Sequence, residues 1–394
     1  MLKLLIHNPS DRPRRGYVTL PLSALGERGD WLQPGRVIAR CGGESIQCQV
    51  ERGAVPELGT LLLAIDPPVP PGGDDDSVAS AEVVLEPAAD AVAPSEGPAA
   101  QLWAGDHVRV ADSEAAEGPF LVPAADLPRV TRVHLASGSL HLDFALGDPQ
   151  TKPGLAGAAL SVTVDAREQL DVSDDWEHHH PRKRCMQIDL VRVSRPGWEP
   201  QPEAVQQLSA GRYELVACSA GPIRASAVVA SPAFSYAFTD PFTGAARELT
   251  SRLYRRIAIH AGESYIWEEA WLHARAPEGS SVALFFQTRY VSYLEHQSPL
   301  RVIQYPDVHG WFAVASPLGG YAFATDAAIG PVSTPHPGLY EGETDQATVA
   351  WLLGVCDRYR AVHLLARGSA NWLGHEVGRA WYELIFRPLQ ARLA

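Results

Sequence analysis

Three features are missing from this sequence: a long apolar run, an excess of basic residues and a pairing pattern among its cysteines. No segment reaches the ~18 consecutive apolar residues that a membrane helix needs. The apolar start, Met1 to Ile6, is shorter than the core of a signal peptide. We therefore expect a cytoplasmic protein with no membrane partner.

The charge balance and the cysteines argue against two further classes of protein. The formal net charge is −13, from 33 Lys and Arg against 46 Asp and Glu, whereas nucleic-acid binding needs a concentrated basic surface. We expect a substrate that is neutral, or anionic and bound locally by arginines. The five cysteines are odd in number and scattered, which predicts reduced, buried thiols rather than a disulfide framework or a zinc knuckle.

Short apolar runs between turn residues dominate the chain of 394 residues. They are rich in Val, Ile, Leu and aromatics and are separated by many of the 33 glycines and 32 prolines, a pattern typical of β-strands. No regular helices alternate with them, which favours an all-β protein of stacked antiparallel sheets. We expect a small N-terminal β-barrel or sandwich over residues 1–66, a loop or linker rich in Pro, Asp and Ala over 67–101, and a large β domain over 102–394.

Few helices are expected. The clearest is Gln346 to Val355, where Thr344 could cap the helix and apolar residues fall on one side. A shorter helical turn is expected over Leu170 to Trp176. The last strand of the large β domain is expected over Arg379 to Phe386.

Several segments resemble the β-rich half of family 38 α-mannosidases. The likeness begins with Leu2 to Leu22, LKLLIHNPSDRPRRGYVTLPL. A motif of asparagine, proline, a polar residue, arginine, valine and leucine-proline-leucine recurs where that half of the mannosidases begins. It continues with Ser173 to Pro181, SDDWEHHHP, which is similar to a tryptophan-containing loop of that region. The paired strands of a galactose-mutarotase-like supersandwich are similar to Tyr213 to Val229 and Arg252 to Leu272, YELVACSAGPIRASAVV and RLYRRIAIHAGESYIWEEAWL.

This resemblance implies a large antiparallel β-supersandwich with few helices over residues 102–394. The same layout also resembles the N-terminal barrel and central sandwich of exo-acting rhamnogalacturonan lyases. In the mannosidases, the nucleophile and the zinc ligands lie in a separate barrel upstream of this region, so no catalytic residue is carried over. The resemblance implies an oligosaccharide or glycoside substrate, and an enzyme of this kind would need its own active site on the concave sheet face.

Ser264 to Ala274 carries the most informative pattern. Alternate residues of a strand face the same side, so one face is expected to hold Tyr265, Trp267, Glu269, Trp271 and His273. Aromatic rings beside a carboxylate suit stacking on sugars next to a proton-transfer group, and desolvation between two indoles would raise the pKa of the Glu269 carboxyl. We assign catalysis to Glu269 and substrate binding to Tyr265, Trp267 and Trp271. The alternative is an aromatic core face with a hydrogen-bonded Glu269.

A second polar segment is Phe285 to Gln297, FFQTRYVSYLEHQ, where the apolar alternation ends in a polar rim. Its side chains could neutralise a uronate carboxylate and abstract the neighbouring proton, as in a lyase, or supply an acid and a base for hydrolysis. We assign substrate binding to Arg289 and Tyr293, and catalysis to Tyr290, Glu295 and His296. The alternative is a solvated loop with ordinary surface charges.

A third segment is acidic and rich in histidine: Asp174 to Arg184, DDWEHHHPRKR. His178 and His180 can point the same way on an extended chain, which permits a divalent metal, although the sequence identifies no third ligand. A second interpretation is a metal-free active-site loop that contributes His179 to catalysis or Trp176 to substrate binding. A third is an exposed loop, so no cofactor is certain.

Three functions remain open. The leading hypothesis is a carbohydrate-active enzyme that cleaves a glycosidic bond, by hydrolysis or elimination, on the concave sheet face. The second is a non-catalytic carbohydrate-binding or assembly subunit, which would work as a homo-oligomer or with a catalytic partner chain. The third is a small-molecule isomerase on a mutarotase-like sandwich, where a His and Glu pair would suffice.

Overall fold

The described part of the chain is mostly β-structure, which confirms the all-β fold class expected from the sequence. Its strands form four antiparallel sheets among the residues that the structure describes. The structure is a computed structural model, and it describes residues 1–52, 59–72, 81–90, 97–104, 108–111, 129–138, 140–146, 159–164, 168–172, 186–194, 205–207, 214–231, 233–239, 244–275, 283–295, 301–302, 311–316, 319–326, 336–339, 346–352, 358–366 and 370–394.

The N-terminal sheet has seven strands in the order β2-β5-β4-β3-β6-β1-β27. The 3-10 helix η1 (Leu22–Gly29) connects its second strand to its third. The strands are β1 (Leu2–His7), β2 (Arg14–Pro21), β3 (Val37–Cys41), β4 (Glu44–Glu51), β5 (Thr60–Val69), β6 (Ala81–Pro87) and β27 (Gln390–Leu393).

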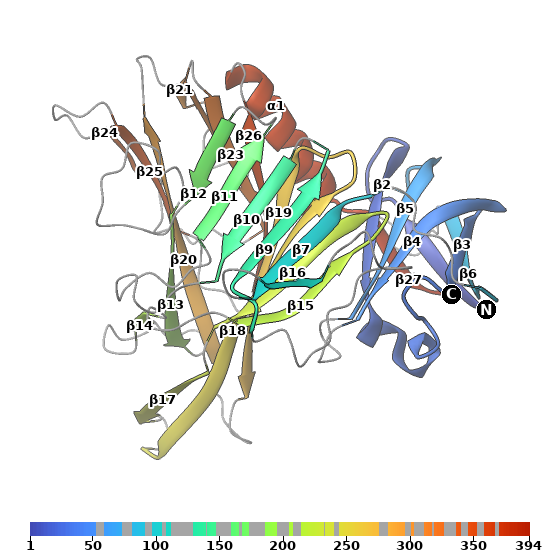
Figure 1. Cartoon of the computed structure of the whole chain (residues 1–394), viewed down its shortest axis with the longest axis horizontal. Coiled ribbons are helices and arrows are strands. Elements are labelled where there is room, and N and C mark those ends of the chain that lie inside the picture. The colour runs from blue at the N-terminus through green and yellow to red at the C-terminus, as the bar shows by residue number, and fades with distance from the viewer. Residues whose placement is uncertain are drawn as a thin grey trace.

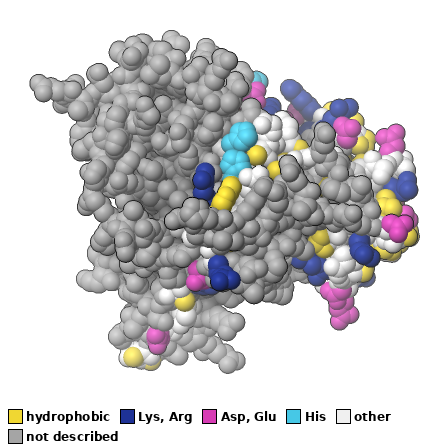
Figure 2. All heavy atoms as spheres, in the orientation of Figure 1, with side chains coloured by type: hydrophobic (Ala, Val, Ile, Leu, Met, Phe, Trp, Pro, Cys, Tyr) yellow, Lys and Arg dark blue, Asp and Glu magenta, His cyan; other side chains and the backbone are white. Residues whose placement is uncertain are grey.

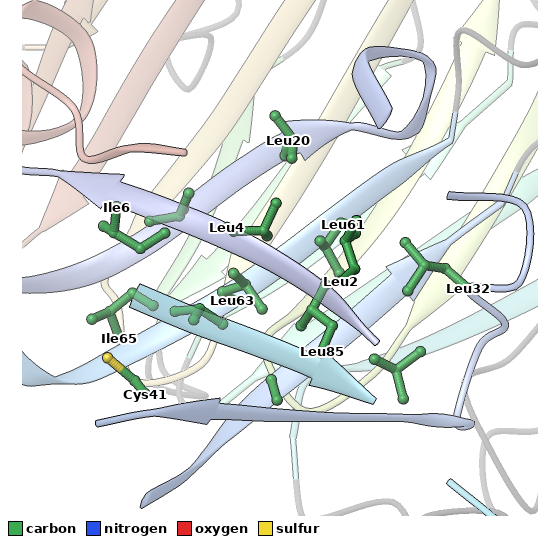
Figure 3. Close-up of a cluster of buried hydrophobic side chains, with 14 of the residues drawn as sticks. Leu2, Leu4, Ile6, Leu20, Leu32, Cys41, Leu61, Leu63, Ile65 and Leu85 are labelled. Atoms are coloured by element: carbon green, nitrogen blue, oxygen red, sulfur yellow. The ribbon is translucent and has the colours of Figure 1, made fainter. Parts of the chain in front are cut away.

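Alternate apolar residues form the core of this sheet. Leu2, Leu4 and Ile6 of β1 are buried, and they pack in one cluster with leucines of β5 and β6 (Figure 3). The period of two along each strand places these side chains on one side of the sheet. The last strand of the chain, β27, pairs with β1, so both chain ends lie in this sheet (Figure 1).

The stretch expected as a loop or linker, residues 67–101, contributes strands to two sheets. β5 runs to Val69, β6 lies between β3 and β1, and the next strand begins at Ala99. The described parts of this stretch are therefore largely ordered strands rather than a disordered linker, because their backbone groups pair within sheets. The division of the chain into domains at residues 66 and 101 stays a prediction.

Three further sheets follow. The six-stranded sheet has the order β12-β11-β10-β9-β7-β8 and consists of β7 (Ala99–Ala104), β8 (Val108–Ala111), β9 (Arg132–Ser137), β10 (Leu140–Ala145), β11 (Ala159–Val164) and β12 (Glu168–Val172). The five-stranded sheet has the order β14-β13-β20-β25-β24 and consists of β13 (Met186–Ser194), β14 (Val205–Gln207), β20 (Ala283–Glu295), β24 (His336–Leu339) and β25 (Gln346–Leu352).

The nine-stranded sheet positions the candidate site. Its order is β15-β16-β18-β19-β26-β23-β22-β21, and β17 pairs with β18. Its strands are β15 (Glu214–Ala220), β16 (Arg224–Ala230), β17 (Phe234–Thr239), β18 (Ala246–His260), β19 (Tyr265–Arg275), β21 (Arg301–Val302), β22 (Trp311–Ser316), β23 (Gly319–Thr325) and β26 (Arg358–Ala366).

One end of the nine-stranded sheet is covered by the helix α1 (Ala370–Ala380) and the π-helix η6 (Trp381–Phe386). The strand expected over Arg379 to Phe386 is therefore wrong. Apolar residues recur here at spacings of three and four and pack on the sheet as one helical stripe. They are the buried Val377, Ala380 and Ile385 and the partly buried Trp381 and Leu384. Among the described residues, no helix is long and apolar enough to cross a membrane.

The two helices expected elsewhere are also wrong where the structure describes them. Residues 346–352 form strand β25, which pairs with β20 on one side and β24 on the other. Thr348, Val349 and Trp351 in this segment favour strands, and two strand partners outweigh a helical pattern over seven residues. In the segment expected as a turn, residues 170–172 belong to strand β12.

Buried polar contacts join the N-terminal sheet to β16 of the nine-stranded sheet. Arg224 donates to the Glu51 carboxylate at 2.9 and 2.6 Å, and neither side chain is more than 5% exposed. Gln49 Oε1 accepts from the backbone N–H groups of Ile223 and Arg224, both at 3.0 Å. A Cβ at Gly221 would lie 2.7 Å from the Gln49 side chain, so this position needs glycine. The two sheets are thus fixed against each other through a fully paired ionic contact.

Charged side chains of both signs are interspersed over the N-terminal sheet on the face seen in Figure 2, rather than gathered into a patch of one sign.

Candidate functional site

The face of β19 that the sequence singled out is divided into a covered end and an open end. Tyr265 is 2% exposed and belongs to the cluster beneath α1 and η6, and Trp267 packs against that cluster. At the other end, Trp271 is only partly buried. Trp267 and Trp271, four residues apart on one strand face, are both partly buried, but of the two only Trp267 packs against that cluster.

Glu269 lies between these ends, in a clamp of two arginines. Arg256 of β18 donates through Nη1 to Glu269 Oε2 at 3.0 Å, and Arg358 of β26 donates through Nε to Oε1 at 3.0 Å and also through Nη2. The side chains of Glu269 and Arg256 are 8% and 6% exposed, whereas that of Arg358 is 57% exposed. One buried carboxylate thus pairs with one buried and one open guanidinium group.

The arginines reverse the pKa shift that was expected for Glu269. Burial by itself would raise the pKa of this carboxyl, but the charges of Arg256 and Arg358 and the hydrogen bonds from Arg358 outweigh burial and hold the pKa below its ordinary value. The expectation of a raised pKa was wrong because the charged partners come from neighbouring strands. The two arginines therefore favour the ionised form of Glu269.

Trp271 forms an aromatic pair at the open end of the face. Its ring stacks on that of Tyr254 of β18, with centroids 5.6 Å apart and planes 10° apart. The guanidinium carbon of Arg256 lies 5.7 Å from the Trp271 ring centroid. Arg358 is directly opposite Trp271 in the β19–β26 register. We call Tyr254, Trp271, Arg256, Arg358 and Glu269 the β19 platform.

Sequence reasoning missed three of these residues: Tyr254, Arg256 and Arg358. A signal for the first two was present in RLYRRIAIH, Arg252 to His260, because Arg252, Tyr254 and Arg256 alternate and share one strand face. No signal in a single strand could show which strands flank β19, so the pairing of Glu269 with arginines required the sheet order.

The opposite face of β19 holds a second buried carboxylate. Glu268 lies 2.7 Å from His363 Nε2 and 3.4 Å from Arg255 Nε, and each of the three side chains is at most 12% exposed. Both neighbouring glutamates of β19 are therefore paired with cationic or imidazole groups inside the protein.

The other predicted site residues stay predictions. Arg289, Tyr290, Tyr293 and Glu295 lie on β20, whose backbone register places Tyr290 opposite Gln187 and Trp351. Trp176, His178, His179, His180 and His296 lie outside the described residues. No group of three or more His, Cys, Asp or Glu residues that could hold a metal ion occurs within the described part of the chain, and this does not test the metal predicted at His178 and His180.

Comparisons with known proteins found structural neighbours of this chain, among them the two that follow. No protein-family model matches the sequence, and no curated protein sequence matches it. Among solved structures, the chain is similar to an alpha-mannosidase from Enterococcus faecalis V583, with 8% identity and a TM-score of 0.44 over 100% of this chain and 46% of that chain. It is also similar to a protein in glycosyl hydrolase family 38 from Enterococcus faecalis, with 9% identity and a TM-score of 0.49 over 100% of this chain and 47% of that chain. The chain spans less than half the length of both, and neither description names a lyase.

Proposed function

We propose that this chain is a carbohydrate-active protein whose β19 platform binds a sugar. The observation that carries the proposal is the stacked Trp271 and Tyr254 pair, which lies partly open beside the exposed guanidinium group of Arg358. Aromatic rings provide apolar surface with a defined geometry for contact with the C–H faces of sugars. Guanidinium groups donate hydrogen bonds in a fixed fork to hydroxyl or carboxylate oxygens.

The charge of the platform favours sugars that carry an anionic group. Glu269 supplies one negative charge against the two positive charges of Arg256 and Arg358, so the platform has a net charge of +1. A uronate carboxylate would contact Arg358, because this guanidinium group is open and Arg256 is buried. The sequence left open a neutral substrate or an anionic one bound locally by arginines, and the charge of the platform favours the second.

The clamp around Glu269 favours sugar binding over proton transfer by that residue. A carboxylate held by two guanidinium groups has a lowered pKa, whereas a general acid needs a pKa near the working pH. Glu269 therefore acts as a positioning residue that holds Arg358 beside Trp271. This favours the binding or assembly subunit over an enzyme that uses Glu269.

Cleavage of a glycosidic bond is a second candidate function, which would rest on other residues. β20 belongs to the five-stranded sheet, approaches β19 at a few positions, and carries Arg289, Tyr290, Tyr293 and Glu295. We propose Tyr290, Glu295, His296 and His179 as its catalytic residues. A screen of glycans for new reducing ends and for the absorbance of unsaturated uronates tests this function, and absence of both products on every glycan that binds would exclude it.

The binding function is tested by calorimetric titration of the whole chain with neutral and uronate-containing oligosaccharides. Trp271→Ala should weaken binding by about 10-fold, the loss expected for one aromatic contact. Trp103→Ala is the matched control, because Trp103 lies on the six-stranded sheet and has Arg132 at 5.1 Å from its ring. The proposal would be contradicted if Trp271→Ala bound the oligosaccharide as tightly as Trp103→Ala.

A further inference from the structure

A cleft separates the N-terminal sheet from the covered end of the nine-stranded sheet. Its volume is about 620 Å³, within the range of ~300–1,000 Å³ that is usual for small-molecule sites. One wall is formed by residues of β2, β4 and β5, and the other by the start of β19 and by α1 and η6. We call this feature the β2–β19 cleft. It is distinct from the β19 platform, because none of the platform residues lines it.

Hydrogen bonds across the cleft fix its two walls. The Tyr17 hydroxyl donates to the backbone oxygen of Ala261 at 2.6 Å, and Arg14 Nη2 donates to the backbone oxygen of Glu383 at 2.7 Å. Arg387 Nη1 donates to the backbone oxygen of Pro9 at 2.9 Å. Because these contacts join the N-terminal sheet to the far wall, the cleft is preformed and a ligand need not order it.

The charges of the lining residues balance. The described residues that line the cleft include three arginines and three carboxylates. The arginines are Arg14, Arg15 and Arg379, and the carboxylates are Asp66, Glu263 and Glu383. Arg379 is occupied, since it bonds Glu376 at 3.2 Å and Glu383 at 3.0 Å. The cleft therefore offers both donors and acceptors without a net charge, which selects against a ligand that carries a charge of either sign.

Glu263 has unused hydrogen-bonding capacity. Its shortest contact to a charged group among the described residues is 3.9 Å, to Arg379 Nη2, and no described donor forms a hydrogen bond with its carboxylate. Burial and the neighbouring Glu383 and Glu376 raise the pKa of this carboxyl, against the opposing charge of Arg379. A partly buried carboxylate is unfavourable without donors, so Glu263 would gain from a ligand that donates hydrogen bonds.

A buried, unpartnered nitrogen lies on the opposite wall. Arg14 is 9% exposed, and its Nε is buried with no hydrogen-bond partner among the described residues, although both of its Nη atoms donate to backbone oxygens. Arg15 and Asp66 on the same wall are open, with a weak ion pair at 3.5 Å. Arg15 is therefore the accessible donor of this wall for a ligand oxygen, whereas Arg14 Nε is reached only if the wall shifts.

We infer that the β2–β19 cleft binds a neutral, hydroxyl-rich ligand of the size of a mono- or disaccharide. Its hydroxyl groups donate to Glu263 on one wall and accept from Arg15 of β2 on the other. Hydroxyl groups fit because each is a donor and an acceptor, as a cleft of balanced charge requires. The inference concerns a second site and does not depend on sugar binding at the β19 platform.

The test is titration of the whole chain with mannose, glucose, galactose and maltose, and with glucuronate and glucosamine as charged comparators, by calorimetry and saturation-transfer NMR. At least one neutral sugar should bind more tightly than either charged sugar. Glu263→Gln should weaken that binding by at least about 10-fold, the effect of losing hydrogen bonds to a charged acceptor. Ser45→Trp, a change at an exposed lining residue of β4, should abolish binding by filling the cleft.

Glu376→Gln is the matched control, because Glu376 also bonds Arg379 but does not line the cleft. It should change the dissociation constant by less than about 2-fold, and melting curves should show that all variants are folded. Absence of binding by every neutral sugar, tighter binding of a charged sugar, or equal losses in Glu263→Gln and Glu376→Gln would overturn the inference. A neutral sugar released by Trp271→Ala and retained by Glu263→Gln would support the β19 platform alone.

Discussion

At the scale of single residues, adjacent glutamates of β19 neutralise cationic groups on opposite faces of one sheet. Glu269 bonds Arg256 and Arg358, while Glu268 contacts His363 and Arg255. Strand alternation sends these carboxylates to opposite faces, and each buried charge is tolerated because a partner from a neighbouring strand lies within reach. Charge compensation is therefore a structural role of both residues, whatever ligand the platform binds.

Replacement of Glu269 should lower stability by more than a surface change would. Glu269→Gln keeps the shape of the side chain but removes the carboxylate charge that lies 3.0 Å from the buried Arg256. Breaking one partner of a buried ion pair costs about 3 kcal/mol or more in the free energy of unfolding. Urea denaturation of the variant and of the unchanged protein measures this difference.

Glu82→Gln supplies the control for that measurement. Glu82 pairs with Lys3 at 3.0 Å on the surface, and both side chains are 46% exposed. An exposed pair of this kind contributes about 1 kcal/mol or less. If Glu269→Gln lowered stability no more than Glu82→Gln, the clamp would not compensate a buried charge.

At the scale of elements, the sequence predicted the positions of strands along the chain better than the order of strands within a sheet. The alternation of Tyr265, Trp267, Glu269 and Trp271 on one face was inferred from the period of two, and β19 spans those residues. The sheet order β18-β19-β26 could not be inferred, because the sequence of one strand does not show which distant strands pair with it. The pKa shift of Glu269 was wrong for the same reason: its cause lies on β18 and β26.

The errors at the C-terminal helices and at β25 have a common origin in short, ambiguous patterns. Residues 346–352 are short enough to fit a helix or a strand, and their neighbours β20 and β24 decide the outcome. For residues 379–386, the helical pattern becomes visible only when Val377 is included, because apolar residues then recur at helical spacing up to Ile385. A strand assignment that begins at Arg379 leaves Val377 out.

The helix α1 should contribute to stability through its buried stripe. Val377 is fully buried, in the same hydrophobic cluster as Tyr265 and Val362. Val377→Ala should lower the free energy of unfolding by about 2 kcal/mol, because it removes buried methyl groups and leaves a cavity. His375→Ala, a change at an exposed position of the same helix, should stay within about 0.5 kcal/mol. Equal effects in a thermal or urea denaturation series would show that α1 does not pack as described.

At the scale of the whole molecule, the N-terminal sheet draws on distant parts of the chain. β6 lies beyond the end of the N-terminal domain expected at residue 66, and β27 comes from the last residues of the chain. Sequence reasoning placed a β domain at the N-terminus but could not supply its last strand, because contacts of such large sequence separation carry no local signal. The same sheet is joined to β16 by Glu51 and Arg224, so the stability of the two parts is coupled.

That coupling predicts a loss of stability in acid. Arg224 and hydrogen bonds from it outweigh the effect of burial and lower the pKa of the Glu51 carboxyl from 4.5 to about 2. In the unfolded chain this carboxyl takes up a proton near its ordinary pKa, whereas in the folded protein it stays ionised, so falling pH favours the unfolded state. The stabilisation by Glu51 is complete above about pH 5 and decreases as the pH falls towards 2, by about 3 kcal/mol in total.

Urea denaturation at intervals from pH 6 to about pH 3 measures this decrease. Glu51→Gln removes the titrating group, so its free energy of unfolding should be lower at pH 6, because the buried Arg224 is left unpaired, and should depend less on pH than that of the unchanged protein. Glu82→Gln, in the exposed pair with Lys3, should keep the original pH dependence. Identical pH dependence in all three proteins would mean that the contact between Glu51 and Arg224 does not stabilise the junction of the two sheets, and the acid sensitivity would have to come from other carboxylates such as Glu269.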